Sequence, residues 1–147
     1  MLADFYPTVF DAVALHAAVM EATGAAPEPL LNEGALEGAL NRPRMAAHYE
    51  DANLPTQTVL LLIGVALNHP FRDGNKRTAL AVADTFLDQN GRTFIGDYLE
   101  LARRLVDVVA LTDRQEREAA VSELISWLDP QLVSTHALPG ASGPRPE

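Results

Sequence analysis

The apolar run VLLLIGVAL at residues 59–67 limits the fold of this chain more than any other stretch. Pro55 suits one of the first positions of a helix, and Pro70 disfavours helical geometry at the residue before it. We therefore expect one helix from Pro55 to about Asn68. The run is too short to cross a membrane, which takes roughly 18 consecutive apolar residues. We expect a soluble, cytoplasmic protein with no membrane partner.

Helical patterns recur along most of the chain. The expected helices cover residues 8–22, 34–41, 55–68, 75–89, 97–111 and 113–128. The second should stop before Pro43, because the residue that precedes a proline avoids helical geometry. Gly24 and the pair Asn90-Gly91 are suited to ending the first and the fourth. The pattern predicts a compact all-α domain of about six helices.

The remaining segments are less regular. Residues 42–55 fit either an extended flap or a broken helix, and RTFI at 92–95 is the best candidate for a strand. The clearest helical face has the spacing i, i+3, i+4, i+7, i+8 and consists of Ala79, Val82, Ala83, Phe86 and Leu87. The Pro- and Gly-rich end of the chain is typical of a flexible tail. We expect a domain over residues 1–132 and a tail over 133–147.

Charge and composition exclude several classes of protein. Twenty acidic residues against eleven basic ones give a net charge of −9, which argues against direct binding of nucleic acid. The absence of cysteine excludes disulfides, thiolate zinc sites and thiol nucleophiles. The N-terminal sequence MLADFYPTVF lacks the basic segment that begins a signal peptide.

A dense polar cluster, HPFRDGNKRTAL at residues 69–80, follows the apolar run directly. Pro70 should push His69 out of helical geometry, and Phe71 should turn inward to anchor the loop. Gly74 permits a positive φ angle and a close approach of the backbone. The next helix begins there, and its first amides have no intrahelical partner. The sequence therefore predicts an anion site at this helix N-terminus.

The side chains of the cluster add to this site. Lys76, the only lysine of the chain, and Arg77 lie in the first helical turn and can donate to the same anion. Asp73 would be repelled by bare phosphate, but one carboxylate together with phosphate oxygens suits Mg²⁺. A histidine such as His69 can serve as a general base near neutral pH. These groups are the parts of a phosphoryl- or nucleotidyl-transfer site.

Each of these residues also has a purely structural explanation. Gly, Pro and Asp are common in helix–loop–helix turns, and Asp73 is suited to capping the second helix. Arg72 and Arg77 have the character of solvated surface charges, and a single histidine is more often structural than catalytic. The residues alone leave both a functional anion site and a structural turn open.

The stretch HPFRDGNKRTA resembles the signature H-x-F-x-[DE]-[GA]-N-[GK]-R of the Fic/Doc superfamily. Lysine in the eighth place is similar to the Doc (death-on-curing) branch, the toxins of Phd–Doc-type toxin–antitoxin modules. LHAAVMEATG, GALEGALNRPRMAAHYED and FLDQNG also resemble Doc, so that the likeness covers roughly residues 9–128. It implies a six-helix Fic-type bundle with a short flap.

The resemblance implies a kinase that uses ATP and Mg²⁺. Doc proteins transfer the γ-phosphate to a threonine of elongation factor Tu, which stops translation, and a cognate Phd-like antitoxin neutralises them. By this likeness, His69 would be the base that activates the target hydroxyl, and Asp73 would hold Mg²⁺. The residues expected to bind ATP phosphates are Gly74, Asn75, Lys76 and Arg77. Those expected to be structural are Pro70 and Phe71.

The resemblance assigns a looser role to Arg42 and Arg44. Both occupy the segment where a flap for docking the target is expected. We find no copy of the inhibitory motif [ST]-x-x-x-E-[GN], which fits control by a separate antitoxin.

Two other functions stay open. The first is AMP transfer by a Fic-type enzyme. Such enzymes carry Gly in place of Lys76 and usually Arg in place of Leu80, although Gly74 is the usual Fic residue where Doc has Ala. The second is a non-catalytic role as a co-repressor that bridges DNA-bound antitoxin, for which the acidic charge of the chain suits a basic partner protein.

Overall fold

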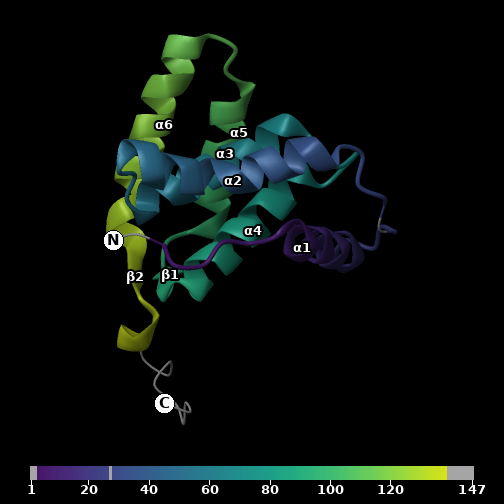
Figure 1. Ribbon diagram of the computed structural model, residues 1–147, viewed down its shortest axis with the longest axis horizontal. Coiled ribbons are helices and arrows are strands. Elements are labelled where there is room, and N and C mark those ends of the chain that lie inside the picture. The colour runs from purple at the N-terminus through teal and green to yellow at the C-terminus, as the bar shows by residue number, and fades with distance from the viewer. Residues whose placement is uncertain (1–2, 27, 139–147) are drawn as a thin grey trace.

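The computed structural model describes residues 3–26 and 28–138. These residues form six α-helices, a two-stranded sheet and two 3-10 turns (Figure 1). The helices are α1 (Val9–Ala22), α2 (Glu33–Glu50), α3 (Leu54–Asn68), α4 (Asn75–Gln89), α5 (Tyr98–Ala110) and α6 (Arg114–Leu128). The strands and 3-10 turns are β1 (Arg92–Phe94), η1 (Asp129–Gln131), β2 (Leu132–Ser134) and η2 (Thr135–Ala137). The predicted all-α fold is confirmed.

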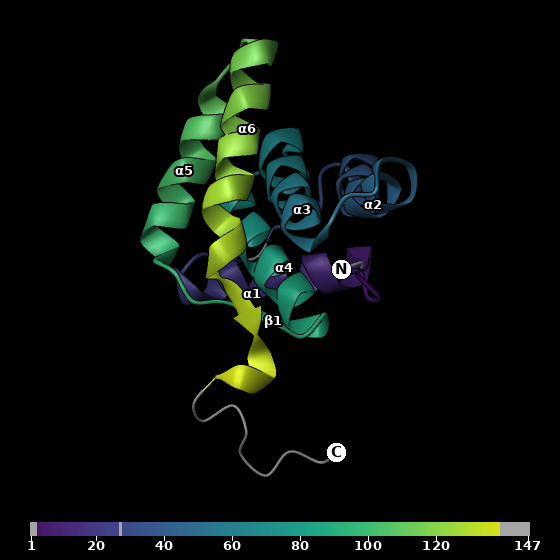
Figure 2. The same ribbon diagram turned by 90° about the vertical axis from the view of Figure 1, so that its left-hand side faces the viewer.

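Helix α3 carries the apolar run and lies at the centre of the molecule. Figure 2 shows it between α2 on one side and α5 and α6 on the other. Nine of its fifteen residues are buried, as expected for a helix that is apolar on nearly every face. Asn53 caps its first turn by accepting a hydrogen bond from the N–H of Thr56. In the part of the chain that the structure describes, no helix is long and apolar enough to cross a membrane.

Helix α4 packs against α3 and α1 and confirms the predicted apolar face, since all five residues of that face are buried. Asn90 ends the helix and ties the N-terminal segment to it. The Asn90 side chain accepts hydrogen bonds from the N–H groups of Asp4 and Phe5 and donates to the carbonyls of Phe5 and Phe86. Gly91 follows at φ 74°, the left-handed conformation that was predicted to end this helix.

The prediction of a short helix that stops before Pro43 was wrong. Helix α2 continues through Pro43 to Glu50, so that residues 42–50 form neither an extended flap nor a broken helix. A proline inside a helix destabilises it by about 3 kcal/mol, but burial of one leucine side chain stabilises the fold by roughly 1.5–3 kcal/mol. Leu36 and Leu40 are both buried and keep α2 packed against α3 on either side of this point.

A close contact between backbones supports the same packing. Gly64 of α3 lies so near α2 that a Cβ atom placed on it would stand 3.2 Å from the Cβ of Ala39. Small residues at a helix crossing allow this approach. Tertiary packing therefore overrides the local preference of the proline.

The segment after η1 forms a strand, β2, that the sequence pattern did not predict. The predicted strand at RTFI is found as β1, and β2 pairs with it in antiparallel register, with Arg92 opposite Ser134 and Phe94 opposite Leu132. The expected domain boundary after residue 132 thus falls inside β2. Residues 139–147 of the expected tail lie outside the described residues.

Candidate functional site

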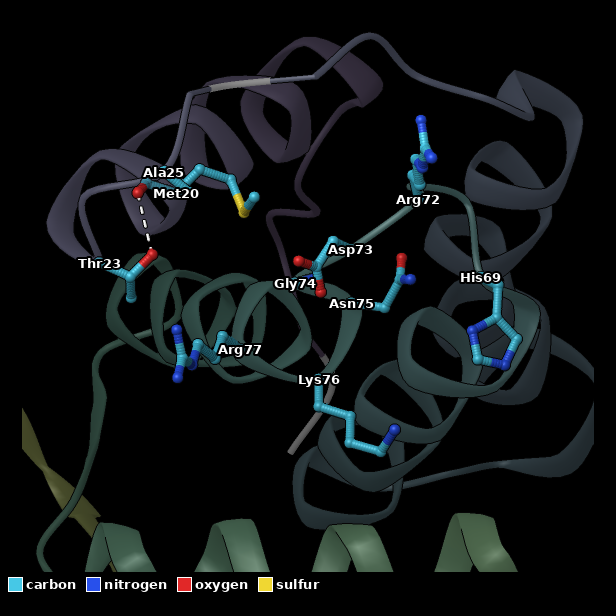
Figure 3. A pocket seen from close by; sticks show the side chains of 10 residues that line it. All are labelled: Met20, Thr23, Ala25, His69, Arg72, Asp73, Gly74, Asn75, Lys76 and Arg77. Atoms are coloured by element: carbon cyan, nitrogen blue, oxygen red, sulfur yellow. Dashed lines mark hydrogen bonds between the residues drawn. The ribbon is translucent and has the colours of Figure 1, made fainter.

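The loop between α3 and α4 borders a cavity of about 480 Å³ (Figure 3). Its walls combine the polar cluster with the C-terminal end of α1 and the residues that follow α1. The lining residues are Met20, Thr23, Ala25, His69, Arg72, Asp73, Gly74, Asn75, Lys76 and Arg77. Every residue that the sequence predicted for base, metal or phosphate contact therefore lines one cavity.

His69 occupies the C-cap of α3 in the left-handed conformation, with φ 46° and ψ 56°. Such a conformation is uncommon outside glycine, although histidine tolerates it better than most residues. Pro70 follows and is buried. The angles of His69 confirm that helical geometry ends there, as the proline predicted. The imidazole is exposed at the cavity, where a reacting group could reach it.

Phe71 anchors the loop in the core. Its side chain is 1% exposed, as the sequence predicted. The Asn75 side chain clamps the Phe71 backbone: its Oδ1 accepts from the Phe71 N–H at 2.9 Å, and its Nδ2 donates to the Phe71 carbonyl at 2.8 Å. Asn75 was expected to bind phosphate. In this structure one Nδ2 hydrogen and Oδ1 bind Phe71, while the second Nδ2 hydrogen and the backbone N–H have no partner among the described residues.

The loop is also tied to the segment before α2. The Pro70 carbonyl accepts hydrogen bonds from the N–H groups of Leu31 and Asn32 at 3.0 and 3.2 Å. Asn32 in turn caps α2 through its side chain, which accepts from the N–H of Ala35. Through these bonds the start of α2 helps to hold the loop in place.

Gly74 is the N-cap of α4 and has φ 76°, so the predicted need for a positive φ is confirmed. The Gly74 N–H donates to Asp73 Oδ1 at 2.8 Å. The first intrahelical bond of α4 runs from the Thr78 N–H to the Gly74 carbonyl. The amides of residues 75–77 therefore lack an intrahelical partner, and with the helix dipole they form a site suited to an anion.

The charges around the cavity favour an anion. Arg72, Lys76 and Arg77 line it, and no described carboxylate lies within ion-pairing distance of any of them. Asp73 is the only carboxylate that lines the cavity among the described residues. Unpaired cations beside free amides are chemically suited to phosphate oxygens.

One residue of this region was not foreseen from the sequence. His16 lies on α1, is 1% exposed, and its Nε2 is 2.9 Å from the Asp73 carbonyl oxygen. Its ring stacks on that of Phe71, with centroids 3.8 Å apart and planes 3° apart. Nothing local distinguishes a single histidine in an apolar helix, because its partners are more than fifty residues away in the chain.

Arg42 and Arg44 lie on α2 and do not line the cavity. Arg42 forms an ion pair with Glu50 at 3.3 Å, and the Arg44 guanidinium lies over the Tyr6 ring at 4.8 Å. The structure therefore keeps these two arginines apart from the loop that carries His69.

Comparisons with known proteins show the family to which the chain belongs. Residues 6–87, more than half of the chain, match the model of the family described as Fic/DOC family. Over 83 residues the chain is 40% identical to Toxin Doc of Mycolicibacterium smegmatis, a stretch that is 54% of this chain and 64% of that relative. Less than two thirds of the relative's length is thus matched. The extent of the family match shows that this chain belongs to the Fic/DOC family.

Proposed function

We propose that this protein is a Doc-type toxin kinase that transfers the γ-phosphate of ATP to a threonine hydroxyl of a translation factor. The observation that carries the proposal is the single cavity that joins His69, Asp73, Lys76 and Arg77 at the start of α4. The 40% identity to a protein named Toxin Doc supports the assignment to a toxin.

Nucleotide phosphates fit the free amides and cations of this site. The volume of about 480 Å³ lies within the range of about 300–1,000 Å³ that is usual for small-ligand pockets. Lys76 and Arg77 would neutralise phosphate charge, and the amides of residues 75–77 would donate to phosphate oxygens. In this role Asn75 would contribute its backbone N–H and the second hydrogen of its Nδ2, since the two bonds to Phe71 use only one of the Nδ2 hydrogens.

The donors around the cavity fit Mg²⁺ only as the partner of a nucleotide. The described residues contain no group of three or more histidines and carboxylates that could hold a metal ion. Asp73 offers one carboxylate, whose Oδ1 already accepts the Gly74 N–H. Mg²⁺ commonly takes one or two carboxylates and completes its shell with water and phosphate oxygens. Asp73 would hold the ion, which supplies charge neutralisation at the phosphates.

His69 is the proposed general base. The imidazole of a histidine can take the proton of a hydroxyl as that oxygen attacks. His69 forms the left-handed cap at the end of α3 and is one of the residues that line the cavity (Figure 3). Loss of a general base typically lowers the rate by about 10²–10⁴-fold.

Lys76 and Leu80 favour phosphate transfer over AMP transfer. AMP-transferring relatives carry glycine and arginine at these two places. Leu80 is half-buried and packs against the hydrophobic core, so that it presents no charge to a nucleotide. Gly74 favours the second candidate, a Fic-type AMP transferase, since it is the residue usual in that group. Both reactions would use His69 and Asp73 alike and differ in the phosphorus atom that is attacked.

The expected partners follow from the same resemblance. Elongation factor Tu is the proposed substrate, and a Phd-like antitoxin is the proposed inhibitor. A co-repressor role through the antitoxin is compatible with the kinase activity. If binding were the sole function, growth arrest and repression would persist unchanged in His69→Ala.

The deciding experiment uses ATP labelled at the α or the γ phosphate. The purified protein is incubated with a bacterial translation extract, and labelled proteins are separated and identified. We expect γ label on one protein, lost in His69→Ala and strongly reduced in Arg77→Ala. Arg114→Ala is the matched control, since Arg114 is an exposed arginine of α6 paired with Glu118.

The outcomes separate the candidates. Label from γ-ATP that disappears with His69→Ala supports the kinase. Label from α-ATP would establish AMP transfer and would refute the interpretation that Lys76 favours phosphate transfer. If neither form labels a protein while the toxin still arrests growth, the kinase proposal fails for the proteins of that extract and the binding role gains weight.

A further inference from the structure

We infer that His16 is a positioning residue that sets the carboxylate of Asp73, an inference that rests on the proposed use of Mg²⁺ and ATP. His16 comes from α1, far from the loop in sequence, and is 1% exposed. A carbonyl oxygen can only accept a hydrogen bond. The contact of 2.9 Å to the Asp73 oxygen therefore requires the proton to be on Nε2.

The imidazole lies against three residues of the loop, Phe71, Asp73 and Gly74. Its face stacks on Phe71 at 3.8 Å, and its Nε2–H binds the Asp73 carbonyl. A Cβ atom placed on Gly74 would lie 3.7 Å from both Nε2 and Cδ2 of the ring, so that the ring also covers Gly74. The buried His16 side chain therefore holds the loop from Phe71 to Gly74, the N-cap of α4.

The effect reaches the carboxylate through one rigid group. A trans peptide is planar, and its C=O and N–H point in opposite directions. When His16 holds the Asp73 carbonyl, the orientation of the Gly74 N–H is therefore determined as well. That N–H donates to Asp73 Oδ1 at 2.8 Å. The donor on His16 consequently directs the carboxylate of Asp73, and Oδ2 is left without a hydrogen-bond partner in the described structure.

Two properties of histidine are needed at this position, and they can be removed separately. His16→Phe keeps a flat ring that can stack on Phe71 but removes the donor. His16→Gln keeps an N–H donor but removes the aromatic stack. Leu124→Ala serves as a stability control, because Leu124 is buried in α6 and lies outside the cavity.

The first measurement does not depend on any activity. Long-range ¹H–¹⁵N correlation of the histidine rings should show His16 with its proton on Nε2. Amide exchange at Gly74 should accelerate in His16→Phe, should return toward the wild-type rate in His16→Gln, and should not respond selectively in Leu124→Ala. A proton on Nδ1 alone, or unchanged exchange at Gly74 in His16→Phe, would overturn the inference.

The second measurement links the residue to the site. ATP is titrated by calorimetry into each variant, once with Mg²⁺ and once with EDTA. Since His16 acts through the Asp73 carboxylate, His16→Phe should weaken binding with Mg²⁺ by about tenfold, the lower end of the effect typical of partners that orient metal ligands. Binding in EDTA should change little. If His16→Phe weakened ATP binding equally with Mg²⁺ and with EDTA, the role of His16 would be structural only.

Failure of the proposed function would be recognised separately. If the wild-type protein binds ATP in neither condition, the nucleotide proposal fails. The ring tautomer and the exchange at Gly74 would still decide whether His16 orders the loop. If wild-type protein binds Mg²⁺-ATP and His16→Phe binds it equally well, His16 has no positioning role.

Discussion

Replacement of Asn75 by alanine tests whether this side chain supports the loop or serves the ligand. Asn75 is 7% exposed, and its side-chain amide makes two hydrogen bonds, both to the backbone of Phe71. Phe71 is itself 1% exposed. Asn75→Ala would therefore remove two bonds and leave a buried N–H and a buried carbonyl without a protein partner.

The expected cost follows from these two bonds. A hydrogen bond contributes about 0.5–1.5 kcal/mol net, and a buried polar group left unpaired costs roughly 1–3 kcal/mol. Alanine forms helices better than asparagine, which stabilises the first position of α4 by about half a kcal/mol at most. We expect a loss of about 2–4 kcal/mol in the free energy of unfolding. For a chain of this size that corresponds to a fall in Tm of roughly 5–15 °C.

Urea unfolding followed by circular dichroism and by the fluorescence of Trp127, the only tryptophan, measures this loss. The matched control is Asn68→Ala. Asn68 also bonds a backbone carbonyl, donating to Gly64 at 2.7 Å, but it is exposed, so that water can replace the lost bond. We expect the control to lose less than about 1 kcal/mol.

The two variants together decide the role of Asn75. If Asn75→Ala costs no more than Asn68→Ala, the clamp on Phe71 is energetically unimportant and the reasoning is refuted. In that case, weaker ATP binding by Asn75→Ala with unchanged stability would support the expectation that the side chain binds phosphate.

Three further predictions use the same unfolding assay. Gly74→Ala should cost about 1–2 kcal/mol, because φ is 76° and the added Cβ would lie 2.9 Å from the Met20 sulfur, which has to move. Asn90→Ala should cost about 2–4 kcal/mol and should increase proteolysis near residue 5, since four hydrogen bonds to residues 4, 5 and 86 are lost. Burial, followed by the hydrogen bond to Asp84, raises the pKa of Tyr98 above its usual value of 10.0. The unfolded chain therefore ionises first, and wild-type stability should fall as pH rises above about 10, whereas Tyr98→Phe should show a smaller fall.

The candidate site was largely predictable because its signals are local. Pro70 disfavours helix at His69, Gly74 allows a positive φ, and a helix that begins at Asn75 must leave amides free. Each of these effects depends on only a few neighbouring residues. The structure confirms that helical geometry ends at His69, that Gly74 has a positive φ and that α4 begins at Asn75. It also brings the predicted residues to one cavity.

The errors arose where distant contacts outweigh local preference. Pro43 predicted the end of a helix, but burial of α2 against α3 keeps the helix intact to Glu50. Strand β2 has no strong pattern of its own and is defined by its pairing with β1. The hydrogen bonds of the Asn75 side chain to the Phe71 backbone were also not foreseen, and the contact of Asn75 with phosphate stays a prediction.

The sequence by itself determined the helical class, the central apolar helix, and a loop of cations and free amides at a helix start. These follow from periodicity, from proline and glycine geometry, and from the side-chain chemistry of adjacent residues. Only the tertiary structure decided that His16 holds the Asp73 carbonyl and that Arg42 and Arg44 stand apart from the cavity. The first contact spans 57 residues of chain, and such contacts depend on how helices pack, which no local pattern records.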